Sequence, residues 1–256
     1  IVNDFLDRIL FRYFDTGAEN WRSSLGIFQA ATKLAVIMSL FVQMFRFAAE
    51  PFFFQRAGKK DNKELYAQVM EYFVAFCGLI FLGVILYIDV ISLFLGRDFR
   101  AGIGVVPVMM LSYMLLGMLF NVSMWYKLSG KTSFAVYITL AGLVVTAVVN
   151  IVFMPRFSYW ASAFGHLSSY VVMLIVSVLL GNKYYPIPYK WGRILFFFLL
   201  AGAIYAVADF MDRSFFSADE ISGILHGGQL AVKIILSTVL IIFYAAVSFL
   251  FLRRRK

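Results

Sequence analysis

Residues 195–200 read Leu-Phe-Phe-Phe-Leu-Leu and lie within the apolar stretch 191–210, WGRILFFFLLAGAIYAVADF. Large apolar residues follow one another here without alternating with polar ones, so the stretch does not fit a strand of a membrane β-barrel. A stretch of this length matches one α-helix crossing the hydrocarbon core of a bilayer, which takes about 20 residues. It therefore predicts a membrane-spanning helix.

Six further stretches of similar length and hydropathy lie along the chain. The chain has 256 residues, of which 62% are hydrophobic and 14% charged, and its mean hydropathy is +0.84. This composition excludes a disordered chain, a coiled coil and an ordinary water-soluble enzyme. We expect an all-α polytopic membrane protein with the end of an earlier helix at 1–14 and spans at about 25–50, 71–95, 104–127, 132–154, 158–181, 191–210 and 230–252.

Basic residues alternate between the two sets of connections that these spans would create. One set carries 13 Lys and Arg residues and the other six. Because cytoplasmic loops of membrane proteins are enriched in Lys and Arg, the richer set should be cytoplasmic, and the C-terminus with it. This explains the net charge of +9 without nucleic acid as a partner. The richer set consists of Arg56, Lys59, Lys60, Lys63, Lys127, Lys131, Lys183, Lys190, Arg193, Arg253, Arg254, Arg255 and Lys256.

The sequence contains no motif for catalysis, a cofactor or a metal. Cys77 is the single cysteine, so it offers neither an intrachain disulfide nor a pair of metal ligands. No glycine-rich phosphate loop, HExxH motif or nucleophile elbow is present. We therefore expect no enzyme activity, no cofactor and no metal site. The chain begins Ile1-Val2-Asn3, which favours a fragment whose upstream part is missing.

The span 25–50 carries an unusual number of polar side chains for a membrane helix. At 3.6 residues per turn, they fall within an arc of about 140°. We call them the polar stripe: Gln29, Thr32, Lys33, Ser39, Gln43, Arg46 and Glu50. A charged side chain at the centre of a membrane helix costs about 2.5–3.5 kcal/mol on insertion scales, so the stripe should face water, a partner or a charged ligand. Packing on polar faces of neighbouring helices is the alternative.

Two parts of the stripe differ in their charge partners. Arg46 and Glu50 are four residues apart and can form an ion pair. Lys33 has Gln29 and Ile37 at the corresponding positions, so no acid on its own helix neutralises it. An unpaired ammonium group facing a cavity is suited to attract a phosphate or an acidic sugar.

Other polar residues within the predicted helices are secondary candidates for lining the path. Asp7 and Arg8 can also form local ion pairs with Asp4 and Arg12. Asn121 and Asn150 fit interhelical hydrogen bonds. His166 lies among small residues, which favours close packing and leaves a proton-carrying role open.

Several blocks of the sequence resemble bacterial polysaccharide flippases of the multidrug/oligosaccharidyl-lipid/polysaccharide exporter superfamily, in particular Bacteroidetes-type members. Lys33–Phe54 (KLAVIMSLFVQMFRFAAEPFFF) is similar to the first full span of their C-terminal lobe. Asp7-Arg8-Ile9-Leu10 resembles the end of the preceding helix, and Asn121–Thr132 (NVSMWYKLSGKT) and Asn182–Pro188 (NKYYPIP) resemble later loops. The resemblance covers residues 1–210.

The resemblance implies a protein of 14 helices in two MATE-like lobes. Residues 1–181 would form the C-terminal lobe, from the end of helix seven to helix 12, and 182–256 would form helices 13 and 14. The N-terminal lobe of the same protein would be missing. The implied function is flipping an undecaprenyl-diphosphate-linked oligosaccharide across the bacterial inner membrane by alternating access, for polysaccharide or O-antigen synthesis.

Roles for individual residues follow from the same resemblance. Gln29, Lys33, Gln43, Arg46 and Glu50 would line the substrate path. Lys33 and Arg46 would meet the diphosphate or acidic sugars, and Glu50 would be a coupling carboxylate. The partners would be the lipid-linked oligosaccharide, membrane lipids and polysaccharide assembly proteins.

Other functions fit the same composition. A drug/cation antiporter and a peptidoglycan-precursor flippase belong to the same superfamily, but the cations of the polar stripe would repel a cationic drug. A membrane-integral polysaccharide polymerase or acyltransferase would need catalytic groups in an outer loop. The region 211–229 offers Asp219, Glu220 and His226 without a supporting pattern. A non-catalytic membrane scaffold would not need the polar stripe.

Overall fold

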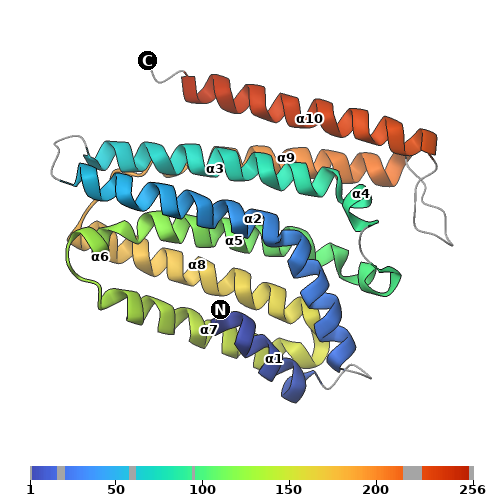
Figure 1. Cartoon of the computed structure of the whole chain (residues 1–256), viewed down its shortest axis with the longest axis horizontal. Helices are drawn as coiled ribbons and strands as arrows, with labels where there is room; N and C mark the ends of the chain where they lie inside the picture. The colour runs from blue at the N-terminus through green and yellow to red at the C-terminus, as the bar shows by residue number, and fades with distance from the viewer. Residues whose placement is uncertain (1, 16–20, 58–61, 94–95, 216–226, 254–256) are drawn as a thin grey trace. The chain divides into compact units, whose positions relative to one another are not determined.

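The computed structural model describes residues 2–15, 21–57, 62–93, 96–215 and 227–253. These residues form helices and no strand (Figure 1). Within them, seven helices are long and apolar enough to cross a membrane. The predicted all-α fold of polytopic membrane type is confirmed. The elements are α1 (Val2–Phe14), α2 (Trp21–Arg56), α3 (Asn62–Leu86), α4 (Ile88–Ser92), the 3-10 helix η1 (Arg97–Val105), α5 (Val106–Val122), α6 (Met124–Leu128), α7 (Phe134–Phe157), α8 (Tyr159–Tyr184), α9 (Trp191–Phe215) and α10 (Gly227–Arg253).

The chain divides into two compact units. The first comprises residues 1–70 and 95–189, and the second comprises 71–94 and 190–256. Helix α3 begins in the first unit and ends in the second. The division at 181/182 that the family resemblance implies concerns membership of a transporter lobe, and it stays a prediction.

The first unit is built around α2, α5, α7 and α8. Helix α8 packs between α7 and α5, and α5 packs on α2, while α1 contacts both α7 and α2 (Figure 1). Ser158 separates α7 from α8 with a φ of 47°, a left-handed conformation that ends one helix and lets the next fold back beside it.

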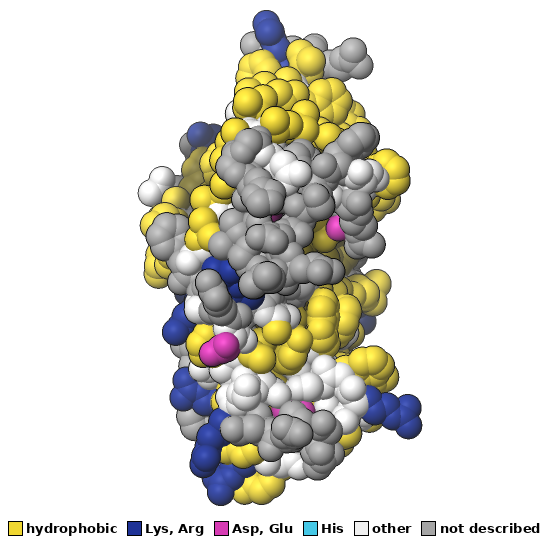
Figure 2. All heavy atoms as spheres, turned by 90° about the vertical axis from the view of Figure 1, so that its right-hand side faces the viewer, with side chains coloured by type: hydrophobic (Ala, Val, Ile, Leu, Met, Phe, Trp, Pro, Cys, Tyr) yellow, Lys and Arg dark blue, Asp and Glu magenta, His cyan; other side chains and the backbone are white. Residues whose placement is uncertain are grey.

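Helix α7 shows why this unit suits a membrane. Its buried residues follow a spacing of four and include small and polar ones: Ile138, Gly142, Thr146, Asn150 and Met154. Its large apolar residues instead point outwards, among them Tyr137, Val144 and Val148. Small residues inside and apolar residues outside are typical of helices that pack in lipid. Hydrophobic side chains also cover much of the described surface in the space-filling view of Figure 2.

The second unit contains the end of α3, α4, α9 and α10. Tyr244 of α10 is fully buried, and its hydroxyl donates a hydrogen bond to the Ala75 carbonyl oxygen over 3.1 Å. A Cβ atom at Gly78 would lie 2.0 Å from the Tyr244 hydroxyl oxygen, so this position has room only for glycine while the tyrosine stays in place. The tyrosine thereby joins the last helix to α3.

Candidate functional site

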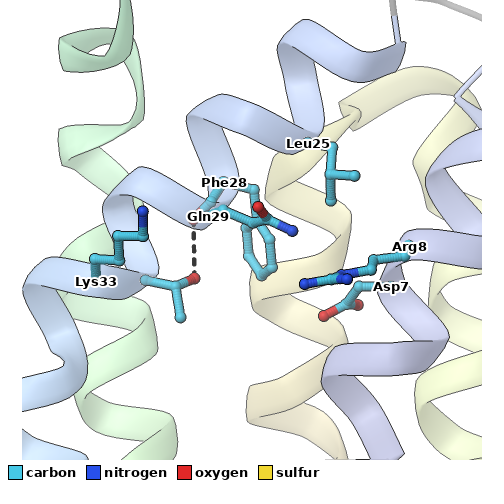
Figure 3. A pocket seen from close by; sticks show the side chains of 7 residues that line it. Asp7, Arg8, Leu25, Phe28, Gln29 and Lys33 are labelled. Carbon is cyan, nitrogen blue, oxygen red and sulfur yellow. Dashed lines mark hydrogen bonds between the residues drawn. The ribbon is translucent and has the colours of Figure 1, made fainter. Parts of the chain in front are cut away.

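A cavity of about 230 Å³ lies in the first unit, between α1 and the first turns of α2 (Figure 3). Figure 3 shows side chains from both helices facing the same space, with Arg8 extending from α1 towards α2. Apolar and polar groups share the wall. The lining residues are Asp7, Arg8, Leu25, Phe28, Gln29, Thr32 and Lys33.

The helical repeat of α2 explains why its polar residues reach this cavity together. Gln29 and Lys33 are one turn apart, so they occupy the same face, and Thr32 lies next to them. The Thr32 hydroxyl donates to the Phe28 carbonyl oxygen over 2.9 Å. That bond leaves the Gln29 amide and the Lys33 ammonium group as the polar groups of α2 available to a ligand.

Two cations line the cavity, Arg8 on α1 and Lys33 on α2. Both side chains are exposed, and neither forms an ion pair with a carboxylate whose placement is described. Lys33 lies twelve residues into α2, about 18 Å along the helix axis. A charge within a membrane-spanning segment is costly without water or an anion beside it. Arg8 and Lys33 thus bring two cations to the wall of the cavity.

The acid that lines the cavity has partners of its own. Asp7 is 2% exposed, and its Oδ2 lies 2.8 Å from Nε2 of His166, which is 1% exposed. Ser162 Oγ lies 3.1 Å from Asp7 Oδ1 and 2.9 Å from Asn150 Oδ1. Asn150 Nδ2 donates to the Thr146 carbonyl oxygen over 2.8 Å. The Asp7 carboxylate is thus held by α8 rather than displayed to a ligand.

Three of the secondary candidates belong to this buried network: Asp7, Asn150 and His166. His166 and Ser162 contact Asp7, and Ser162 also contacts Asn150. Sequence reasoning offered local ion pairs for Asp7, whereas its described contacts are with α8. Ser162 was not a candidate, and its place between Asp7 and Asn150 is the feature that sequence reasoning missed. Its signal was the run of small residues around His166.

The second half of the polar stripe forms a separate cluster. Arg46 Nε lies 3.7 Å from Glu50 Oε1, as the four-residue spacing predicted. Glu50 also pairs with Lys127, and the Arg46 guanidinium lies 4.8 Å from the centre of the Phe120 ring. Lys33 and Arg46 are thirteen residues apart, about 20 Å along α2. The polar stripe therefore contributes to two separate sites, the cavity and this cluster. In the cluster, Arg46 and Lys127 both pair with the Glu50 carboxylate.

The remaining predicted residues lie outside both clusters. Gln43 is half-buried on α2 between them. Asn121 of α5 is 2% exposed, and neither atom of its amide group has a hydrogen-bond partner among the described residues.

Charged residues of the second unit form two groups of their own. The Lys233 ammonium lies 2.7 Å from Asp212 Oδ2 and also pairs with Asp89. Glu71 is fully buried, and its Oε2 lies 3.4 Å from Arg193 Nη1. Arg193 and Glu71 pair one to one, whereas the Lys233 ammonium group contacts two carboxylates; in both groups the charged side chains contact one another, which favours a structural role.

No protein-family model, curated protein or solved structure matches the chain. Among the residues that the structure describes, no three His, Cys, Asp or Glu side chains are grouped so that they could hold a metal ion. The seven apolar helices support a multi-pass membrane protein.

Proposed function

We propose that the chain belongs to a membrane transporter that flips a lipid-linked oligosaccharide across the inner membrane. The observation that carries the proposal is the cavity lined by Arg8, Lys33 and Gln29 within a bundle of apolar helices. Two cations and an amide match a diphosphate, which presents several anionic oxygens to charge-assisted hydrogen bonds.

The volume of the cavity limits how much of the substrate it would hold. Drug-sized ligands occupy pockets of about 300–1,000 Å³. A cavity of about 230 Å³ suits a diphosphate and one adjoining group rather than a whole oligosaccharide. The sugars would extend beyond it, and the cluster of Arg46, Glu50 and Lys127 offers a second polar contact farther along α2.

The charge of the cavity favours an anion over the cargo of a drug/cation antiporter. Among the lining residues that the structure describes, Asp7 is the carboxylate, and His166 and Ser162 contact it. A cationic drug would meet Arg8 and Lys33 without a displayed carboxylate. A peptidoglycan-precursor flippase shares the diphosphate chemistry and differs in the group that the diphosphate carries.

The test replaces Arg8 and Lys33 in cells that make the protein. In the R8Q/K33L variant, we expect surface polysaccharide to fall at least about tenfold and lipid-linked precursor to accumulate, because two charge-assisted contacts to the substrate are lost. The control is Arg12→Gln, which removes an exposed arginine of α1 outside the cavity. Unchanged surface polysaccharide in R8Q/K33L, at normal protein level, would show that the cavity does not carry the substrate.

A further inference from the structure

The end of α8 presents one aromatic ring to two lysines. The Lys131 ammonium lies 3.8 Å from the centre of the Tyr184 ring, and the Lys183 ammonium lies 5.6 Å from the same centre. Lys131 belongs to the turn between α6 and α7, and Lys183 to the last turn of α8. Two segments about 50 residues apart in the sequence thus bring two cations to one place.

The ring that organises these lysines is held firmly. Tyr184 stacks on Trp125 with ring centres 5.8 Å apart and an angle of 13° between the planes, and it contacts the Phe134 ring at 5.3 Å. Trp125 is buried, and its Nε1 donates to Ser177 Oγ over 3.1 Å. Tyr184 thus packs on Trp125 and Phe134, and both ammonium groups lie at this one aromatic cluster, which we call the cationic platform.

The charges of the two lysines are not neutralised by the part of the chain that the structure describes. Both side chains are exposed, and neither pairs with a described carboxylate. Lys127, four residues before Lys131, differs from these two lysines because it pairs with Glu50. Two cations on one ring repel each other, and an anion between them removes that repulsion.

An apolar surface runs along the helices from this cationic platform. On α8, Ile175 and Leu179 are 53% and 65% exposed, and they precede Lys183 at intervals of four residues on the same face. On α7, Tyr137 and Leu140 are 66% and 50% exposed close to the turn that carries Lys131. The surface thus combines cations at one end with exposed apolar side chains beside them. An anionic phospholipid has the complementary arrangement, a charged headgroup joined to apolar chains.

We propose that Lys131, Lys183 and Tyr184 form a binding site for the headgroup phosphate of an anionic phospholipid, whose acyl chains lie along the exposed faces of α7 and α8. Aromatic rings and lysines at the ends of membrane spans lie at the level of lipid headgroups, and basic residues there attract anionic lipids. The exposed apolar side chains of α7 and α8 favour a lipid over a soluble phosphate. This site is separate from the cavity, so it does not depend on the proposed transport function.

The test measures binding of a short-chain phosphatidylglycerol to the full chain in a neutral detergent, by native mass spectrometry. Phosphatidylcholine with the same chains tests the net negative charge, and glycerol 3-phosphate tests the need for acyl chains. The variant K131Q/K183Q removes both cations. The control R56Q/K63Q removes two cations from the same set of basic connections, which lie at the Phe52 and Tyr185 rings instead.

We expect phosphatidylglycerol to bind at least about tenfold more tightly than either comparison compound. K131Q/K183Q should weaken this binding about thirtyfold, from the loss of two lysines near the lipid surface, and the control less than about threefold. Tyr184→Leu should also weaken binding, whereas Tyr184→Phe, which keeps the ring, should not. Equal binding of the two lipids, equal binding of glycerol 3-phosphate, or equal losses in K131Q/K183Q and its control would each overturn the proposal.

Discussion

His166 Nε2 lies 2.8 Å from Asp7 Oδ2 beside the cavity, although 159 positions separate the two residues in the sequence. Both side chains are almost fully buried, and Ser162 adds a second contact to the same carboxylate. A buried acid is tolerated when charge and hydrogen bonds are supplied to it. This contact joins α1 to α8 and keeps the Asp7 carboxylate away from a ligand.

Asp7→Ala should destabilise the protein, because His166 and Ser162 lose the acceptor that they share. Leaving a buried hydrogen-bonding group without its partner costs about 1–3 kcal/mol, and Asp7→Asn should cost less because an amide oxygen still accepts a hydrogen bond. The free energy of unfolding in mixed detergent and dodecyl sulfate measures this. The control is Asp98→Ala, at an exposed position of η1. Equal stability of the Asp7→Ala and Asp98→Ala proteins would contradict a structural role for the pair.

We expect Lys233 of α10 to stabilise the folded protein, because its ammonium group contacts the carboxylates of both Asp89 and Asp212. The two carboxylates are 43% and 38% exposed, and Lys233→Met leaves them near each other without the cation that both contact. We expect the midpoint of thermal unfolding to fall by several degrees in Lys233→Met. The triple variant D89N/D212N/K233M should regain most of the loss, since it removes the charges together.

The matched control for Lys233 is Arg253→Met, which removes an exposed cation from the same helix. It should leave the unfolding midpoint within about a degree of the parent protein. If the triple variant is no more stable than Lys233→Met, the cluster does not act through its charges.

The basic connections predict which ends of the helices face the cytoplasm. In a Cys77→Ala background, a cysteine introduced at exposed Ala57 should react with an impermeant maleimide only from the cytoplasmic side. A cysteine at exposed Ala101 of η1 should react only from the opposite side. Labelling of intact cells and of inverted membrane vesicles measures this. Reaction at Ala57 from outside would reverse the orientation.

Hydropathy located the spans because each needs about 20 apolar residues, and this constraint is local. It placed the ends less well. Helix α2 begins at Trp21 and ends at Arg56, beyond the expected 25–50, because the helix continues through polar residues and through Pro51. Helix α9 likewise continues past residue 210 to Phe215. Hydropathy detects apolar side chains, but the backbone hydrogen bonds of a helix do not require them, so a helix can extend beyond its apolar stretch.

The helical repeat also predicted the local contacts of the site. The pairing of Arg46 with Glu50 and the common face of Gln29 and Lys33 depend on spacing within one helix. The contacts of Asp7 with His166, and of Glu50 with Lys127, depend on how distant helices pack. Periodicity contains no information about that packing, so these partners could not be predicted from one sequence.

The most direct test of the central claim is whether the cavity prefers an anion. The full chain in neutral detergent is titrated with a short-chain prenyl diphosphate and with the corresponding uncharged prenyl alcohol. We expect the diphosphate to bind at least about tenfold more tightly, and R8Q/K33Q to lose that preference while R12Q keeps it. Equal binding of diphosphate and alcohol, or an unchanged preference in R8Q/K33Q, would contradict the account.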